Sequence, residues 1–540
     1  MPRRGVRLLA VSGLFVLLTA AMTWPQALDL SSAATPHHDV YFNLWRLRWF
    51  AHALVTPSAR LFDANIFHPE PRTLALSDAM FVEGVAAAPL LWAGVAPVLV
   101  HNLLLLGAMA GSGVAMFALA RYLTGSRAAG VLAGIVFAFA PYRFEHAMHM
   151  ELQWAMWMPL AFLALHRAFD TGQWKYGLAT GACVALQMLS SIYYGIFLAS
   201  LIALGAALLM ARDRQVPLRR ALVVLGGGAA LAAAISAAYA IPYLRVHDRV
   251  GDRSDVEVAA FSARPSSYLA ATPTNRLYGR GSTRRAAGAE RRLFPGAIPV
   301  VLAVAGLLLR TPSRRAIVYL LLLVAAFETS LGFGGYAYTF LHDHVPAFRV
   351  LRAPARLGIC VLMFLGVLAA YGYQAIVEGR RAIVRLSFAT VLALGLLAEY
   401  RVTFPLATYP NAAPPIYRVL AQQPRGVVAE FPAPRADALP GNDAEYSYLS
   451  TFHWFPLVNG YSGVYPLSYL ARLDRLLDFP GAQSLAQLRR DHVAYVVVHG
   501  SSYPEPEFQA LRARIQLDGA LVEVRSFDDA NGRAVLYRLR

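Results

Sequence analysis

Long apolar runs recur through the first 400 residues of this chain and constrain its fold more than any other feature. Runs of about 18–22 apolar residues are long enough to cross the roughly 30 Å hydrocarbon core of a bilayer as helices. Hydrophobic residues make up 57% of the 540 residues and charged residues only 15%. This length alone would suggest several soluble domains, but the runs instead predict a mainly α, polytopic membrane protein.

Basic residues cluster in the short loops between the apolar runs, and such loops stay on the cytoplasmic side of a membrane. With Arg3, Arg4 and Arg7 ahead of the first run, this pattern predicts a cytoplasmic N-terminus and eleven spans. A cleaved signal peptide is the alternative for the first run, and twelve or more spans are the alternative count. Phe81–Val95 is then re-entrant or juxtamembrane. The predicted spans are Arg7–Trp24, 98–120, 128–141, 152–166, 176–191, 193–211, 221–242, 293–309, 316–332, 356–377 and 383–400, with basic clusters at Arg121/Arg127, Arg167/Lys175, Arg212–Arg220, Arg310–Arg315 and Arg380–Arg385.

Residues 401–540 lack long apolar runs and alternate short strand patterns with helical ones, which predicts a small α/β domain. We therefore expect two domains: a transmembrane helical bundle over 1–400, with a first outer loop at 25–97, and an extracytoplasmic α/β domain over 401–540. The outward loop Arg245–Arg292 is basic, but long loops are translocated with little regard to charge. The expected strands are Gly426–Phe431, His492–His499, Leu521–Phe527 and Ala534–Leu539, and the expected helices are Pro415–Gln422, Leu467–Leu477, Ser484–Arg490 and Pro506–Leu517.

The first outer loop contains an acidic, aromatic-rich segment with the sequence TPHHDVYFNLWRLRWFAHALV, residues 35–55. Its periodicity predicts an amphipathic helix at the membrane surface, with Phe42, Trp45 and Trp49 on one face. Asp39 opens this helix and is the candidate catalytic residue, since a carboxylate beside an acceptor hydroxyl can take its proton as general base. Two alternatives stay open: Asp39 caps the helix, or it binds a metal with His37 and His38.

A second constellation, YRFEHAMHMELQ, joins two short apolar runs on the predicted outer side. It places Arg143, Glu145, His146 and His149 at membrane depth, where ionisable groups are costly unless they are paired or face water. We expect them to bind substrate. Snorkelling and mutual pairing is the alternative.

A third segment, PAFRVLRAPAR, brings Arg349, Arg352 and Arg356 to an outward interface. Guanidinium groups bind phosphate in a fork geometry, so these arginines are candidate ligands of a lipid phosphate, with attraction to anionic headgroups as the alternative. Glu83, inside an otherwise apolar segment, is expected to pair with one of them or to act as a second acid.

The last segment, STFHWFPLVNGYSGVYP, is crowded with aromatic and turn-forming residues. Aromatic faces stack on sugar rings, with Asn and His supplying hydrogen bonds, so His453 and Asn459 are candidate acceptor ligands together with Trp454 and Tyr461. A buried aromatic core of a small domain is the alternative.

Several other classes of function have little support in the sequence. The net charge of +17 lies mostly in short loops and does not indicate nucleic-acid binding. Neither GxxxxGK[ST] nor a GxGxxG after a strand is present, so a cytosolic nucleotide-binding domain is not expected. Cys183 and Cys360 lie in apolar runs and give neither a disulfide framework nor a cysteine metal site.

Asp39, the aromatic helix, DANIFHPEP and the apolar half-span together resemble the start of bacterial polytopic GT-C-type glycosyltransferases. FAPYRFEHAMHMELQW, RVLRAPARLG and FHWFPLVNGYSGVYP resemble later segments of one bacterial branch of these proteins. The resemblance implies a polyprenyl-phosphate sugar donor and action at the extracytoplasmic face. Asp39 matches the acidic residue of the first loop, although His38 precedes it where many relatives carry a second acid.

The resulting hypothesis is an inverting membrane glycosyltransferase of the bacterial cytoplasmic membrane. It moves a sugar from a polyprenyl-phosphate donor to an envelope glycan, lipid or protein acceptor, with Asp39 as general base. No metal site is predicted, and a requirement for Mg²⁺ or Mn²⁺ is left open. The alternatives are a transporter or flippase of lipid-linked saccharides and a non-catalytic envelope-assembly protein.

Overall fold

The computed structural model describes residues 2–212, 216–282, 288–529 and 532–540. The gaps fall partly within the basic cluster Arg212–Arg220 and the loop Arg245–Arg292, so 213–215 and 283–287 of these segments lie outside the described residues. The chain forms two compact units. Unit 1 comprises Met1–Asp29, Leu103–Ala240 and Asp252–Pro405, and unit 2 comprises Leu30–Asn102, Ile241–Gly251 and Leu406–Arg540.

This division differs in one respect from the domains expected from the sequence. Unit 2 resumes at Leu406, close to the expected boundary at residue 400. Residues 30–102, however, which include most of the expected first outer loop, belong to the same compact unit as the C-terminal part of the chain.

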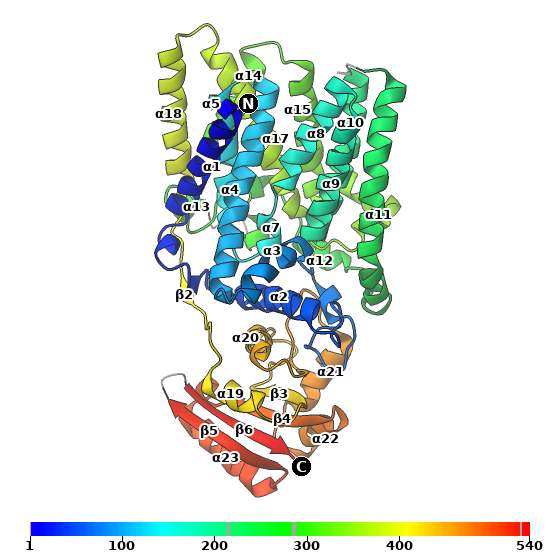
Figure 1. Cartoon of the computed structure of the whole chain (residues 1–540), viewed down its shortest axis with the longest axis vertical. Helices are drawn as coiled ribbons and strands as arrows, with labels where there is room; N and C mark the ends of the chain where they lie inside the picture. The colour runs from blue at the N-terminus through cyan, green and yellow to red at the C-terminus, as the bar shows by residue number, and fades with distance from the viewer. Residues whose placement is uncertain (1, 213–215, 283–287, 530–531) are drawn as a thin grey trace. The chain divides into compact units, whose positions relative to one another are not determined.

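Unit 1 is a bundle of helices that run lengthwise beside one another (Figure 1). Each of the eleven expected spans coincides with a helix, which confirms the mainly helical class. Six helices in the described part of the chain are long and apolar enough to cross a membrane, while α14 and the apolar part of α1 are shorter. The helices are α1 (Pro2–Met22), α4 (Pro97–Thr124), α5 (Arg127–Phe139), α6 (Pro141–Glu145), α7 (Met150–Gln153), α8 (Trp157–Thr171), α9 (Trp174–Ser190), α10 (Ile192–Arg212), α11 (Leu218–Val250), α12 (Asp255–Ala260), α13 (Gly279–Ser282), α14 (Ala297–Leu308), α15 (Arg314–Ser330), α16 (Tyr336–His344), α17 (Gly358–Val377) and α18 (Ala382–Glu399).

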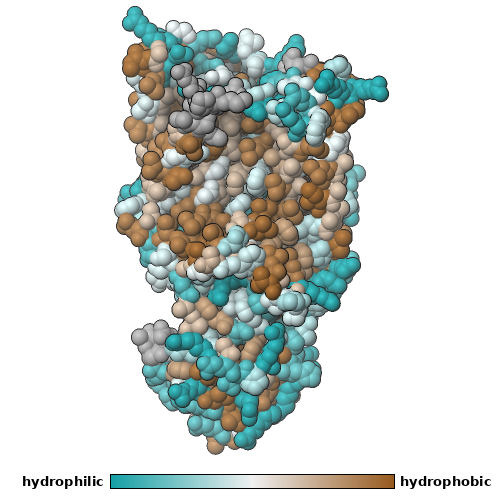
Figure 2. Space-filling view, in the orientation of Figure 1, coloured by the Kyte–Doolittle hydropathy of each residue, from teal (hydrophilic) through white to brown (hydrophobic). Residues whose placement is uncertain are grey.

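Helix α17 lies at the centre of the bundle, where it packs against α5, α14 and α15. Glycine permits the closest of these approaches: a Cβ atom on Gly372 would collide with the backbone carbonyl of Leu302 in α14. Helices α9 and α11 meet in the same way at Gly181 and Gly228. On the face of the bundle that Figure 2 shows, apolar side chains cover much of the surface between its two ends, as expected of helices that face lipid.

Unit 2 contains two sheets and a group of short helices (Figure 1). In the larger sheet the strand order is β3-β4-β6-β5, with β3 and β4 parallel and the other pairs antiparallel. This confirms the small α/β architecture after residue 400. The ends of the four expected strands and four expected helices differ from the observed ends by two residues or fewer. The strands are β1 (Ala33–Ala34), β2 (Ala407–Thr408), β3 (Val427–Phe431), β4 (Val493–His499), β5 (Leu521–Asp529) and β6 (Gly532–Leu539), and the helices are α2 (His38–Val55), α3 (Phe81–Trp92), α19 (Pro415–Ala421), α20 (Asp443–Leu449), α21 (Leu467–Leu476), α22 (Ala482–Arg490) and α23 (Glu505–Asp518).

The two faces of the larger sheet differ in character. Val496 and Val498 of β4 point into an apolar core with residues of α21, α22 and α23. Because side chains alternate along a strand, His499 points to the opposite face, where Tyr417 of α19 contacts it. Glu430 of β3 also lies on this opposite face, paired in register with Val497. One face is therefore an apolar core and the other carries buried polar groups.

Helix α2 is more buried than an amphipathic surface helix would be, and its place at the membrane surface stays a prediction. The helix packs against α3 and α20 within unit 2. Ten of its side chains are buried, and these include the polar residues Asn43 and Arg46. Both terminal nitrogens of Arg46 find partners inside the protein, since they donate to the carbonyl of Asp78 at 2.7 Å and to the side chain of Asn43. Helix α2 is thus a core helix of unit 2.

Candidate active site at Asp39

Asp39 lies in the first turn of α2 with a side chain that is 15% exposed. The N-cap of this helix is His37, whose Nδ1 accepts a hydrogen bond of 3.1 Å from the backbone N–H of Asp39. The alternative that Asp39 is the helix cap is therefore wrong. A carboxylate in the first helical turn is stabilised by the helix dipole, and the partial exposure leaves it open to a reactant.

A residue from the far end of the chain reaches this carboxylate. The hydroxyl of Tyr461 donates a hydrogen bond of 2.6 Å to Oδ1 of Asp39. Burial raises the pKa of Tyr461, and the neighbouring negative charge of Asp39 raises it further, so the phenol stays protonated and acts as a donor. Phe42 of α2 supports the tyrosine with an edge-to-face contact, with 5.2 Å between ring centroids.

The backbone just before Tyr461 is paired with the first loop on one side and with strand β3 on the other. The N–H of Leu457 donates to the carbonyl of Asn65 at 2.7 Å, and the N–H of Phe67 donates to the carbonyl of Asn459 at 3.0 Å. On the other side, Asn459 accepts through Oδ1 from the N–H of Glu430 at 2.8 Å and donates through Nδ2 to its carbonyl at 3.0 Å. Segment 457–461 is therefore held on both sides.

The candidate acceptor ligands in this segment are occupied inside unit 2. Asn459 is buried, and its amide also donates to Asp443 at 3.1 Å. His453 is buried too, and its Nδ1 accepts from the N–H of Phe455 at 2.9 Å. Trp454 stacks on His52 of α2 with 4.1 Å between ring centroids. These contacts give Asn459 and His453 a clear structural role, and their role as acceptor ligands stays a prediction.

Carboxylates are buried behind this segment, on the polar face of the sheet. Glu430 is fully buried, and one of its oxygens, Oε2, lies 2.5 Å from the hydroxyl of Tyr417 and 2.6 Å from Nε2 of His499. Asp443 accepts a 2.5 Å hydrogen bond from Tyr469. Burial raises the pKa of Asp443 to about 7, although hydrogen bonds from Tyr469 and Asn459 oppose this.

In unit 1, the predicted constellation after α5 is largely paired within the protein. The buried guanidinium of Arg143 donates to the carbonyls of Leu152 and Gln153 at 3.2 and 2.9 Å, which fixes the turn that contains α7. Glu145 forms an ion pair of 2.5 Å with Arg292. Arg143 and Glu145 thus bind other groups of the protein, Arg143 the backbone and Glu145 Arg292, rather than each other as the alternative of mutual pairing expected, and substrate binding stays a prediction.

The two histidines of this constellation contact each other and a carboxylate that the sequence reasoning missed. Nδ1 of His146 lies 3.2 Å from Nδ1 of His149, and Nε2 of His146 lies 3.7 Å from Oε2 of Glu290. Arg356 donates to Glu290 from two nitrogens, at 3.0 and 2.6 Å. Burial alone would raise the pKa of Glu290, but the charge and hydrogen bonds of Arg356, together with the charges of His146 and His149, outweigh it and lower that pKa. Glu290 lies in a basic loop with no periodic pattern, so only its negative charge among arginines could have drawn attention to it.

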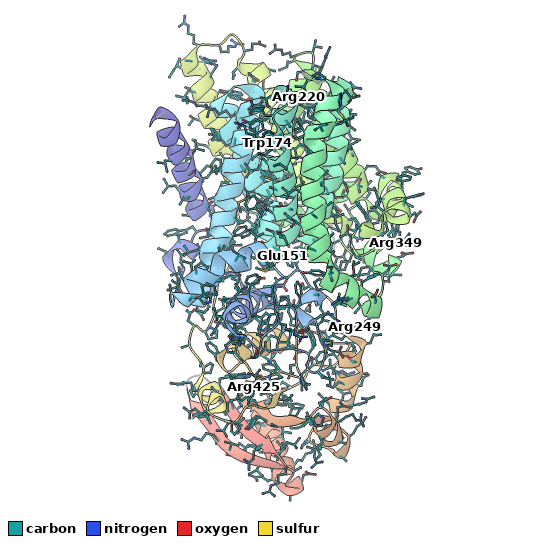
Figure 3. The ribbon with its side chains drawn as sticks, turned by 45° about the vertical axis from the view of Figure 1, so that its right-hand side comes forward. Glu151, Trp174, Arg220, Arg249, Arg349 and Arg425 are labelled. Carbon is teal, nitrogen blue, oxygen red and sulfur yellow. The ribbon has the colours of Figure 1, made fainter. Side chains whose placement is uncertain are left out.

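The other two arginines of the predicted phosphate site have different surroundings. Arg349, labelled in Figure 3, follows the 3-10 turn Pro346–Phe348 and donates to the carbonyls of His342 and Asp343 at 3.2 and 3.0 Å. Arg352 is 29% exposed and lies 3.6 Å from Glu257, with its guanidinium 5.2 Å from the ring centroid of Phe261. Of the two arginines that pair with a carboxylate, Arg352 is held more loosely than Arg356, whose distance to Glu290 is 2.6 Å.

Glu83 lies in the first turn of α3 and is fully buried. The helix approaches α2 closely here, because a Cβ atom on the next residue, Gly84, would overlap the ring of Phe50. A carboxylate at this position is stabilised by the dipole of α3. Its role, as a partner of Arg349, Arg352 or Arg356 or as a second acid, stays a prediction.

Possible metal ligands were sought among all the residues that the structure describes. Within that part of the chain, no group of three or more His, Cys, Asp or Glu side chains is arranged to hold an ion. His37, His38 and Asp39 are thus adjacent without forming such a group, and the need for Mg²⁺ or Mn²⁺ is left to experiment.

Solved structures resemble this chain although its sequence has no match to a family model or to a curated protein. The arabinofuranosyltransferase AftD from Mycobacteria, solved by cryo-EM, superimposes on 99% of the chain with a TM-score of 0.66 at 14% identity. The R1389S mutant of AftD gives 0.64 at 16% identity, again over 99% of the chain. The chain has a GT-C-like fold. It spans only 40% and 41% of the length of these two structures.

A second GT-C-like structure extends the comparison to another enzyme. The archaeal oligosaccharyltransferase AglB from Archaeoglobus fulgidus, in complex with an inhibitory peptide and a dolichol-phosphate, covers 99% of this chain and 74% of its own length. The TM-score is 0.50 at 12% identity. At such identities the likeness shows the fold, and the activity has to be argued from the site.

Proposed function

We propose that this chain is a membrane glycosyltransferase that takes sugar from a polyprenyl-phosphate donor and transfers it to an envelope glycan, lipid or protein acceptor. The observation that supports the proposal most is a GT-C-like fold over 99% of the chain, with a partly exposed carboxylate, Asp39, at the start of α2. The likeness to an arabinofuranosyltransferase makes an arabinofuranosyl donor the first to test.

In the proposed reaction Asp39 is the general base. It takes the proton of an acceptor hydroxyl while that oxygen attacks the anomeric carbon from the side opposite the phosphate. The bond between the anomeric carbon and the phosphate oxygen breaks, and polyprenyl phosphate leaves with the electron pair. The anomeric configuration inverts because there is one displacement. A phosphate leaves without being protonated, so the reaction needs no general acid.

Three arginines, Arg349, Arg352 and Arg356, are predicted ligands of a lipid phosphate. Arg356 already shares its charge with the buried Glu290, so a phosphate would have to compete with that carboxylate. Arg352 is partly exposed and lies 3.6 Å from Glu257. We therefore assign the main phosphate contact to Arg352, since a guanidinium can bind a phosphate through two parallel hydrogen bonds. The site would lie on the extracytoplasmic side, as the loop charges predict.

The test uses the full-length protein, purified in lipid nanodiscs, with a panel of radiolabelled polyprenyl-phosphate sugars. We expect one donor to release its sugar and free polyprenyl phosphate. Asp39→Asn should reduce this rate by about 10²–10⁴-fold, which is the usual contribution of a general base. The matched control is Asp437→Asn, which removes a carboxylate from an exposed pair with Arg435.

Three outcomes would overturn the proposal in different ways. Equal rates for the Asp39→Asn variant and the wild type would remove Asp39 from the mechanism. Movement of lipid-linked sugar across vesicles without covalent change would favour a transporter. Absence of turnover with every donor, combined with glycan binding, would favour a non-catalytic assembly protein.

A further inference from the structure

We propose that Tyr461 is a positioning residue for Asp39, so that the C-terminal part of the chain holds the proposed base in its reactive orientation. The inference rests on the proposed role of Asp39. It concerns a contact between two residues 422 positions apart in the sequence.

The geometry of the contact is that of a strong hydrogen bond. At 2.6 Å, the distance between the Tyr461 hydroxyl and Oδ1 of Asp39 lies in the range of O–H donors to carboxylates, which are about twice as strong as neutral pairs. Such a bond fixes the plane of the carboxylate. It also stabilises the charged form, so Asp39 gives up its proton at a lower pH than it would without this donor.

The tyrosine is held in place more firmly than its loop position suggests. Asn459 ties the segment to both backbone groups of Glu430, and the N–H of Phe67 pairs with the carbonyl of Asn459. A Cβ atom on Gly460 would collide with the ring of Phe67, so only glycine lets this segment approach Phe67 so closely. The edge of Phe42 limits rotation of the tyrosine ring.

Other charged and titratable groups of unit 2 lie near this pair and have to be considered in a pH experiment. His37 and His38 flank Asp39 in sequence, and Nδ1 of His37 lies 3.3 Å from Oδ2 of Asp39. That nitrogen already accepts from the N–H of Asp39, so neutral His37 cannot also donate through it. Tyr465 and Arg46 act electrostatically on the same site. None of these groups is changed when only the Tyr461 hydroxyl is removed.

The experiment measures protonation of Asp39 without needing a substrate. N,N′-dicyclohexylcarbodiimide reacts with protonated carboxyl groups, and mass spectrometry of the full-length protein after digestion locates the adduct at Asp39. We expect labelling of the wild type to fall as the pH rises. In Tyr461→Phe the midpoint should lie about one pH unit higher, as the loss of a hydrogen bond to a charged group implies.

The matched control is Tyr448→Phe, which removes a buried hydroxyl that donates to the carbonyl of Pro410 at 2.6 Å. It should leave the labelling midpoint of Asp39 unchanged. An unshifted midpoint in folded Tyr461→Phe would overturn the inference.

Activity separates this inference from the proposed function. With an active donor, Tyr461→Phe should move the acidic limb of the pH–rate profile to higher pH by the same amount as it moves the labelling midpoint. It should also lower kcat more than it raises KM. If Asp39→Asn keeps full activity, the proposed function fails while the labelling shift still decides the role of Tyr461. If Asp39→Asn is inactive and Tyr461→Phe has an unchanged profile, the function stands and the positioning role fails.

Discussion

Arg356 donates to the buried Glu290 from both Nε and Nη2, at 3.0 and 2.6 Å from Oε1. This pair connects the start of α17 to the loop before α14. Its interior location means that neither charge can be removed alone without leaving the other in a poorly solvated site. Variants of this pair therefore measure how much a buried ion pair, as distinct from helix packing, contributes to the stability of unit 1.

Replacement of Arg356 by Met should destabilise the protein by about 3–5 kcal/mol, because Glu290 then loses its principal counter-charge. Glu290→Gln, which keeps the shape of the side chain but leaves Arg356 unpaired, should also destabilise it. The midpoint of thermal unfolding in detergent checks both. Arg310→Met is the matched control, since Arg310 pairs with Glu378 at 3.0 Å where both side chains are 58% exposed, and it should cost at most about 1 kcal/mol. Equal losses for Arg356→Met and Arg310→Met would contradict this assignment.

A second prediction concerns the contact between α9 and α11. Gly181→Leu places a side chain where the carbonyl of Gly228 lies, so the two helices have to separate. We expect loss of the monodisperse folded species in gel filtration. Gly107→Leu in α4 is the control, because a Cβ atom there meets nothing within 4 Å. Normal folding of Gly181→Leu would show that this helix pair tolerates separation.

A third prediction follows from the raised pKa of Asp443, about 7 against an ordinary value of 3.8. The folded protein holds this proton more tightly than the unfolded chain does. The stabilisation is complete below about pH 4 and is lost as the pH rises through about 7, with a total of at most about 4 kcal/mol. Between pH 4 and 8, the midpoint temperature of thermal unfolding should therefore fall more steeply in the wild type than in Asp443→Asn.

Glu445 lies on the same helix and also has a raised pKa, owing first to burial. The effect of Asp443 is therefore the difference between the pH curves of the wild type and Asp443→Asn, in both of which Glu445 is present. Glu445→Gln supplies the matched control. Parallel pH curves for wild type and Asp443→Asn would mean that Asp443 titrates normally in the folded state.

Much of the fold was predictable because it depends on local patterns. The strands at Val493–His499 and Gly532–Leu539 are rich in β-branched and aromatic residues, and the long helices are continuous apolar runs. The burial of α2 was not predictable in this way. Asn43 and Arg46 look like a solvent-facing side of the helix until their bonds to each other and to the carbonyl of Asp78 are known.

The candidate site shows the same limit. Asp39 and Tyr461 each belonged to a segment singled out by composition, yet nothing periodic in the sequence links residues 422 positions apart. Glu290 was missed because it lies between arginines in an irregular loop. Pairings of this kind are set by the tertiary fold, which a single sequence does not encode as a local signal.

The last prediction concerns the proposed donor site. Arg352→Gln should raise KM for the active polyprenyl-phosphate sugar by about 10–100-fold, the value of a charged hydrogen bond, with a smaller change in kcat. Steady-state rates at varied donor concentration measure the two constants. Arg435→Gln, on the exposed pair with Asp437, is the control for loss of one positive charge and should leave KM unchanged. An unchanged KM in Arg352→Gln, together with a raised KM in Arg349→Gln or Arg356→Gln, would move the phosphate contact to that residue, because only a cation that binds the phosphate directly should alter donor affinity so strongly.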